Sequence, residues 1–295
     1  MIHLTNVIDA AALLLRWLHV VAAIVWVGSA FALARLDFAM KPRGNDPRPQ
    51  TLFLHAGAGF RLSRAENADA DEPALDFKWE AYTVFVSGFL LLILAFCLDP
   101  RAGLVDAALW DAPAWAAAGA ALALPFAVWL AYDFLCKKSG LGGDRLLGAL
   151  FLFAAALALL LMHVFAGSAA LPLLGANLGT IMVANMAHVV VPAQRRRLAT
   201  LRAGAPADAA EAQKAAARAA HNQYLALPTI FFMLSGHAPW LLAATHRDLV
   251  ACLLIGAGFL IRRTFLKRAR GLGWDKQLIA GGAACLVAAF ALATL

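Results

Sequence analysis

The chain has 295 residues, of which 62% are hydrophobic, and a formal net charge of +7. An ordinary soluble domain is roughly half apolar, and here the excess comes as separate long apolar runs, which exclude a soluble protein whose basic charge binds nucleic acid. The four cysteines are isolated and there is no C-x-x-C-H, which excludes a zinc knuckle and a covalent c-type haem site.

Long apolar runs recur along the whole chain. One helical crossing of a bilayer needs about 20 apolar residues, and helices satisfy their own backbone hydrogen bonds in lipid. The sequence therefore predicts an all-α, polytopic bundle of about eight transmembrane helices, forming a single membrane domain over residues 1–295. In chain order the predicted spans are Ala11–Ala34, Ala81–Leu98, Ala114–Tyr132, Leu146–Ala170, Ala176–Ala193, Gln223–Ala243, Leu249–Ile261 and Gln277–Leu295.

Lysines and arginines gather in alternate loops between these spans. The intervening loops hold only Arg101 and Arg247. Cytoplasmic loops of membrane proteins carry the excess of Lys and Arg, so the basic loops are predicted to be cytoplasmic and both termini periplasmic. These loops cover approximately residues 38–79, 134–145, 194–222 and 262–276.

Three histidines lie toward the predicted outer face on different spans, namely His19, His163 and His237. Neutral imidazole is a good haem or metal ligand, so these side chains are candidate ligands of a b-type haem. The alternative is that each is a packing histidine hydrogen-bonded to a neighbouring helix.

Span five carries Asn185 and His188, which share one helix face. Gly175 and Gly179 form a small-xxx-small pair that permits close approach of another helix. The polar residues are either hydrogen-bonding contacts between helices or one wall of a substrate site.

Span six opens on the string His221-Asn222-Gln223-Tyr224, and Glu80 stands where the apolar run of span two begins. His221 or Glu80 is a candidate base, and Asn185, Asn222 and Tyr224 are candidate donors to a bound substrate. The alternative for residues at the ends of spans is anchoring at the membrane interface.

Several strings together resemble the membrane domain of the bacterial cytochrome-c-linked urate oxidases, the PuuD-type urate hydroxylases. They occur in family order over spans one to seven. The strings are RWLHVVAAIVWVGSAF (Arg16–Phe31), HAGAGF (His55–Phe60), FKWEAY (Phe77–Tyr82), YDFLC (Tyr132–Cys136), GDRLL (Gly143–Leu147), GTIMVAN (Gly179–Asn185), PAQRR (Pro192–Arg196), HNQYLALP (His221–Pro228) and SGHAP (Ser235–Pro239).

This resemblance implies a multi-pass protein of the bacterial inner (plasma) membrane that oxidises urate toward 5-hydroxyisourate in purine catabolism. It adds His55 to the candidate substrate-binding residues. The family's C-terminal cytochrome c domain is absent from these 295 residues, so the resemblance implies that electrons pass to a separate cytochrome c, soluble or membrane-bound. The family pattern also leads us to expect a histidine where Arg61 stands.

Two other functions remain open from the residues alone. The protein could be an electron carrier that binds haem b through His19, His163 and His237. It could also be a purine transporter, although the sequence shows no internal repeat and no pair of broken helices of the kind that transporters use.

Overall fold

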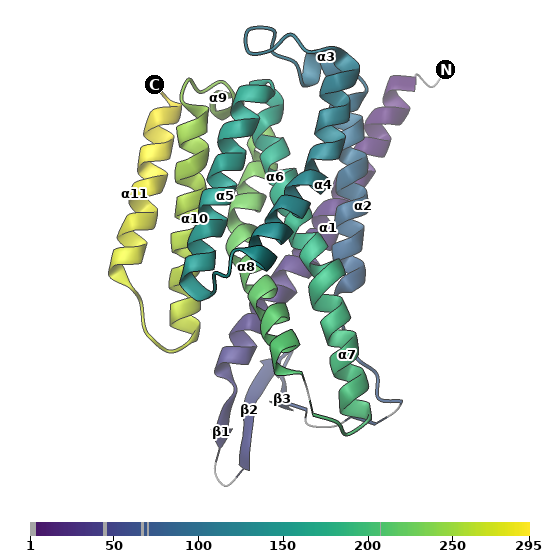
Figure 1. Cartoon of the computed structure of the whole chain (residues 1–295), viewed down its shortest axis with the longest axis vertical. Helices are drawn as coiled ribbons and strands as arrows, with labels where there is room; N and C mark the ends of the chain where they lie inside the picture. Colours follow the sequence, from purple (N-terminus) through teal and green to yellow (C-terminus); the bar gives the residue numbers. More distant parts are fainter. Residues whose placement is uncertain (1–3, 44–45, 66–67, 70, 207) are drawn as a thin grey trace.

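The computed structural model describes residues 4–43, 46–65, 68–69, 71–206 and 208–295. Long helices lie side by side along the long axis of the molecule, and a small sheet lies beyond one end of the bundle (Figure 1). The helices are α1 (Leu4–Ala39), α2 (Lys78–Leu92), α3 (Pro100–Gly103), α4 (Ala114–Lys138), α5 (Gly143–Val164), α6 (Gly167–Asn185), α7 (Val191–Arg202), α8 (Ala209–Leu234), α9 (Pro239–Leu242), α10 (Arg247–Ala269) and α11 (Lys276–Ala293). The strands are β1 (Lys41–Arg43), β2 (Asp46–His55) and β3 (Ala58–Ser63).

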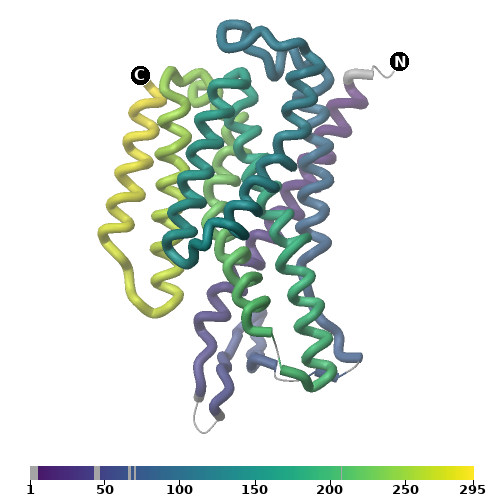
Figure 2. The backbone as a smooth tube through the Cα atoms, in the orientation of Figure 1, coloured from purple at the N-terminus to yellow at the C-terminus, as the bar shows by residue number. Residues whose placement is uncertain are grey.

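The chain runs up and down the bundle in alternation through α1, α2, α4, α5, α6, α8, α10 and α11 (Figure 2). The start of α1 and the end of α11 lie at the same end of the bundle, opposite the sheet (Figure 1). Within the described residues, seven helices are long and apolar enough to cross a membrane, judged by length and composition. These apolar helices confirm the mostly helical bundle and are compatible with a membrane protein.

The sixth predicted span, Gln223–Ala243, differs from the other seven. The second half of α8 covers its first part, and a 3-10 turn at Ser235–His237 and the short α9 cover the rest. Because the first half of α8 is polar and charged, α8 is not among the seven apolar helices. It nevertheless packs inside the bundle, against α6 and α10.

Two of the apolar passes contain a π-helical turn. Ile93–Cys97 ends the pass that α2 begins, and Met186–Val190 joins α6 to α7 without a break in the helical run. Single π turns inside α-helices are rare and frequently lie at functional sites. The second turn directly follows Asn185, which is fully buried.

Glycines allow the central helices to approach closely. A Cβ added at Gly175 of α6 would lie 3.0 Å from the backbone nitrogen of Met233 on α8. One added at Gly258 of α10 would lie 2.7 Å from the ring of Pro228 on α8. The close helix approach predicted from Gly175 is thus confirmed, and α8 is held tightly between α6 and α10.

The outer surface of the bundle is apolar. Large side chains on α1 and α11 are strongly exposed, including Leu14 at 66% and Val287 at 70%. Soluble monomers rarely expose contiguous apolar patches of more than a few hundred Å². An exposed apolar belt of this kind is typical of helices that face lipid.

The small sheet was not predicted from the sequence. It is antiparallel in the order β1-β2-β3, and His55 pairs with Ala58 across the turn between β2 and β3. Ala56 and Gly57 both have positive φ, of 48° and 81°, as a two-residue type I′ hairpin requires. The predicted cytoplasmic loop 38–79 therefore contains a folded hairpin beside the helices.

Candidate functional site

Six polar side chains from three helices form one buried cluster, the polar cluster. Each is at most 8% exposed. They come from the end of α4, the end of α6 and the middle of α8, where these helices meet. The members of the polar cluster are Tyr132, Asp133, Asn185, Arg218, His221 and Asn222.

Hydrogen bonds join the polar cluster into a chain. The Asn185 side-chain amide donates to Tyr132 Oη at 3.0 Å and to Asn222 Oδ1 at 2.9 Å. Asn222 Nδ2 donates to the carbonyl oxygen of Met182 at 2.9 Å. Tyr132 Oη lies 2.7 Å from His221 Nδ1. Three candidates from the sequence, Asn185, His221 and Asn222, are thus linked in one network, and Tyr132 bridges Asn185 and His221.

Arg218 supplies the positive charge of the polar cluster. Its guanidinium donates to Asn185 Oδ1 at 3.2 Å and to Asp133 Oδ1 at 2.7 Å, and it lies 4.8 Å from the centre of the Tyr132 ring. Asp133 also pairs with Lys137 at 2.6 Å. A buried charge is tolerated when it is paired and hydrogen-bonded, and here both conditions hold.

A cavity of about 1040 Å³ adjoins the polar cluster. His221, Tyr224 and Arg218 line it from α8, together with residues of α5, α7 and α10. Small-molecule sites commonly have volumes of about 300–1,000 Å³, so the space suffices for a purine. Seven Lys or Arg side chains and three carboxylates line the cavity, and this balance favours an anionic ligand.

Two of these cations have no carboxylate partner within the described residues. Lys214 and Arg270 form no ion pair there; the Arg270 guanidinium carbon lies 5.0 Å from the centre of the Phe38 ring, and its charge acts on Asp144 from beyond ion-pair distance. By contrast, Arg263 forms a two-pronged pair with Asp144 at 2.8 and 3.0 Å. The cavity therefore retains positive charge that its own acids do not neutralise.

His221 lies in the predicted loop 194–222, outside the seven apolar helices. Burial, with a contribution from the nearby Arg218 guanidinium, lowers the pKa of His221 to about 4. The imidazole is consequently neutral at physiological pH. A neutral ring has one N–H donor and one acceptor nitrogen.

Two candidate residues lie outside this site. His55 ends β2, is exposed and stacks on Phe53 at 6.2 Å between ring centres. Glu80 lies in the first turn of α2, where a carboxylate complements the helix dipole. One of its oxygens is buried without a hydrogen-bond partner within the described residues. Neither side chain belongs to the polar cluster or to the lining of the cavity.

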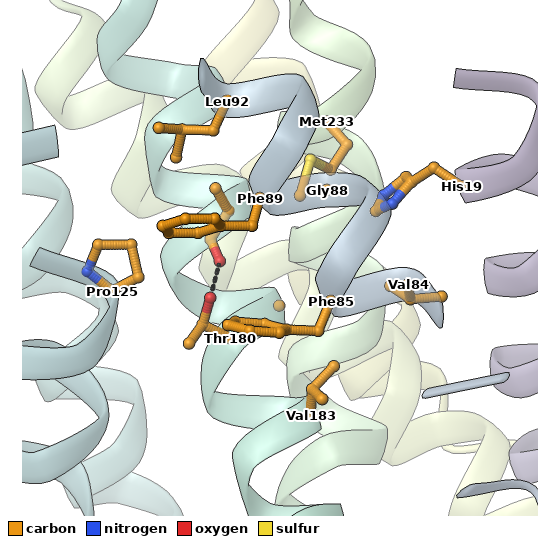
Figure 3. A pocket seen from close by; sticks show the side chains of 12 residues that line it. His19, Val84, Phe85, Gly88, Phe89, Leu92, Pro125, Thr180, Val183 and Met233 are labelled. Carbon is orange, nitrogen blue, oxygen red and sulfur yellow. Dashed lines mark hydrogen bonds between the residues drawn. The ribbon is translucent and has the colours of Figure 1, made fainter. Parts of the chain in front are cut away.

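His19 occupies a second, smaller cavity of about 50 Å³ (Figure 3). Its ring lies over Gly88 of α2, where an added Cβ would come within 2.8 Å of His19 Cε1. Its Nδ1 contacts the hydroxyl of Ser87 at 3.1 Å. Phe85 and Phe89 of α2 point away from His19, toward Thr180 of α6 and Pro125 of α4 (Figure 3).

The three histidines expected as haem ligands do not form a site that fits haem. The cavity at His19 has a sixth or less of the volume of a usual ligand pocket. His163 is exposed and contacts the carbonyl of Leu159 on its own helix at 2.8 Å, and His237 is exposed in the turn after α8. Within the described residues no group of three His, Cys, Asp or Glu side chains could hold a metal ion.

Sequence reasoning missed the central role of Arg218, Tyr132 and Asp133. In the sequence Arg218 is one of six basic residues of the predicted loop 194–222, and Tyr132 and Asp133 stand at the end of the third predicted span. A signal existed, because Arg218, His221, Asn222 and Leu225 recur at helical spacing and share one face of α8. His188 was noted for its spacing from Asn185, and it lines the cavity and lies 4.6 Å from the Trp129 ring centre.

Comparison with known proteins identifies the family of the chain. No curated protein and no solved structure matches the chain significantly. A family model described as "Urate oxidase N-terminal" matches residues 5–293, nearly the whole chain. That match includes every helix that contributes to the polar cluster and the cavity. The chain therefore belongs to the urate oxidase N-terminal family.

Proposed function

We propose that the protein is a membrane-bound oxidoreductase that oxidises urate toward 5-hydroxyisourate and passes the electrons to a separate cytochrome c. In this reaction the urate monoanion and one water give neutral 5-hydroxyisourate, one proton and two electrons. A new C–O bond forms at the purine ring, and the electrons reduce two equivalents of ferricytochrome c. Family membership supports urate as the substrate.

The observation that carries the location of the site is the basic cavity beside the polar cluster. Urate is a planar anion near neutral pH. The cavity offers the unpaired cations Lys214 and Arg270 at its wall and His221 and Tyr224 on α8. Asn185 and Asn222 act from behind this wall, since their amide groups are bonded within the protein. We therefore assign urate to this cavity rather than to the space at His19.

The proposal includes an orientation in the bilayer. The cavity lies among loops 134–145, 194–222 and 262–276, which carry most of the basic charge. By the positive-inside rule these loops are cytoplasmic, and both termini are periplasmic. Urate then enters from the cytoplasm into a bundle that crosses the bacterial inner membrane.

The test is anaerobic urate consumption by membranes that contain the full chain, with oxidised soluble cytochrome c added. Urate loss with reduction of two equivalents of cytochrome c is the expected result, and His221→Ala should abolish it. His163→Ala is the matched control, because His163 is exposed and touches its own helix. Folded protein that shows no urate loss with any added acceptor would contradict the proposal.

Two further measurements separate the alternatives. Uptake of urate into liposomes without oxidation would identify a purine transporter. A haem absorption band in the purified protein, lost in His19→Ala, would identify a b-type electron carrier. The cations that face the same cavity as His221 support a site for an anionic ligand there, which the b-type electron carrier does not require.

A further inference from the structure

We propose that His221 presents its Nε2–H group to the anionic ligand as a hydrogen-bond donor, and that Arg218 fixes this tautomer through Asn185 and Tyr132. This inference rests on the proposed function for the identity of the ligand. The tautomer itself follows from the hydrogen bonds of the polar cluster. Arg218, Asn185 and Tyr132 are then positioning residues, and His221 is the residue that contacts the ligand.

The orientation of the Asn185 amide is fixed from two sides. Arg218 is only a donor, so the atom of Asn185 that faces it at 3.2 Å must be the carbonyl oxygen. On the other side, Asn222 uses its own NH₂ group on the carbonyl oxygen of Met182. The Oδ1 atom of Asn222 therefore faces Asn185, and the NH₂ group of Asn185 donates a hydrogen bond to it at 2.9 Å.

The amide orientation determines the proton of Tyr132. Because Asn185 Nδ2 donates to Tyr132 Oη at 3.0 Å, the hydroxyl is an acceptor on that side. Two acceptors lie within reach of its single proton, the Cys136 thiol and His221 Nδ1 at 2.7 Å, and the imidazole nitrogen is the stronger acceptor, so the proton goes to Nδ1. The Nδ1 atom of a neutral imidazole that accepts this proton is unprotonated, so the ring hydrogen is on Nε2.

The Nε2 group is available to a ligand. His221 lines the cavity, and Nε2 has no hydrogen-bond partner within the described residues. A donor at this place suits an oxygen or a deprotonated nitrogen of a purine anion. His221 was expected from the sequence to act as a base, and in this arrangement Nε2 already carries a proton and cannot accept another.

The polar cluster also disfavours a positive charge on the His221 ring. The Arg218 guanidinium and burial both disfavour the imidazolium, and the pKa of His221 falls to about 4. Of the titratable groups near the ring, Tyr132 and Cys136 of α4 are neutral, and Asp133 is paired with Arg218 and Lys137. The neutral His221 donor and the separate cations of the cavity can therefore bind an anionic ligand without a proton transfer.

The test reads the tautomer directly, by ¹⁵N NMR of histidine-labelled full-length protein in lipid nanodiscs near pH 7. The His221 signals are assigned by their loss in His221→Gln. The expected spectrum shows a protonated Nε2 and an unprotonated Nδ1. A protonated Nδ1, or an imidazolium, would overturn the proposal.

Two variants test whether the polar cluster sets the tautomer. In Asn185→Asp the carboxylate cannot donate to Tyr132, and the hydroxyl proton turns away from His221. In Tyr132→Phe the donor to Nδ1 is gone. Both should give a mixed tautomer, and because only the Nε2–H fraction can donate to the ligand, anaerobic urate binding should weaken in proportion to that fraction, by about twofold for an even mixture. An unchanged tautomer in both variants would contradict the proposal that Asn185 and Tyr132 set the tautomer of His221.

Asn177→Asp is the matched control, because Asn177 is a fully buried asparagine of the same helix that bonds the Leu173 carbonyl outside the cluster. It should leave both the tautomer and urate affinity unchanged. Arg218→Lys keeps a positive charge beside Asp133, so the variant should fold. It loses the fixed guanidinium donor to Asn185 Oδ1, so His221 should no longer have a single tautomer. Since the tautomer is read without ligand, an Nε2–H signal in protein that fails to bind urate would contradict the proposed function alone.

Discussion

The buried His221 and the partly buried His19 have very different surroundings. His221 belongs to a cluster of six polar side chains and lines a cavity of about 1040 Å³. His19 contacts one hydroxyl, that of Ser87, beside an otherwise largely apolar cavity of about 50 Å³. Their positions in apolar stretches of sequence had suggested similar importance.

The difference teaches which signs of function are informative in a membrane bundle. A polar group that is taken out of water is costly unless it is hydrogen-bonded, and both histidines have a hydrogen-bond partner. Only His221 is joined to further polar groups whose bonds determine its protonation, and only His221 faces space for a ligand. We therefore take the network and the cavity together, rather than the histidine, as the mark of the site.

The largest expected effect comes from removing the charge of the polar cluster. Arg218→Met leaves Asp133 buried at 8% exposure with only the exposed Lys137 as a partner. Breaking a buried pair costs about 3–5 kcal/mol. Thermal unfolding in detergent should show a large loss of stability. Arg263→Met is the matched control, because its partner Asp144 has 76% of its side chain exposed, and should cost at most about 1 kcal/mol.

A smaller effect is expected at the other histidine. Gly88→Ala places a Cβ 2.8 Å from His19 Cε1, and overpacking of this kind costs about 1–3 kcal/mol. Gly28→Ala, with nothing within 4 Å of the added Cβ, should be neutral or slightly stabilising. Thermal unfolding measures both. A large loss of urate affinity in Gly88→Ala would show that the region around His19 also contributes to urate binding, and would contradict the distinction between the two regions.

The smallest expected effect is that of pH on ligand binding. The lowered pKa of His221, about 4, arises from burial and from Arg218. Between about pH 8 and pH 6 the ring therefore stays neutral, whereas an ordinary histidine would become half protonated near pH 6.5. Urate affinity, measured by anaerobic titration, should change by less than about twofold over this range. A steep change centred near pH 6.5 would show that His221 titrates normally.

Much of the helical architecture was predictable, because apolar runs of about 20 residues leave the backbone few alternatives in lipid. The small residue Gly175 also predicted the close packing of α6 on α8. The hairpin Asp46–Ser63 was missed, since its signal is a short run of mixed residues around the turn Ala56-Gly57.

The site was predictable only in part. Asn185, His221, Asn222 and Tyr224 were named as candidates, and the structure places them around one cavity or directly behind it. Arg218 could not be ranked above other basic loop residues, because its partner Asp133 is 85 positions away in the chain. The same limit applies to His55 and Glu80, which the fold places elsewhere.

The most direct test of the account is anaerobic equilibrium binding of radiolabelled urate to purified protein in nanodiscs, without an electron acceptor. The two variants to compare are His221→Ala and His19→Ala, each checked for folding by thermal unfolding. We expect His221→Ala to weaken binding by about tenfold or more and His19→Ala to leave it unchanged. The reverse pattern would move the site to the small cavity at His19 and contradict the account.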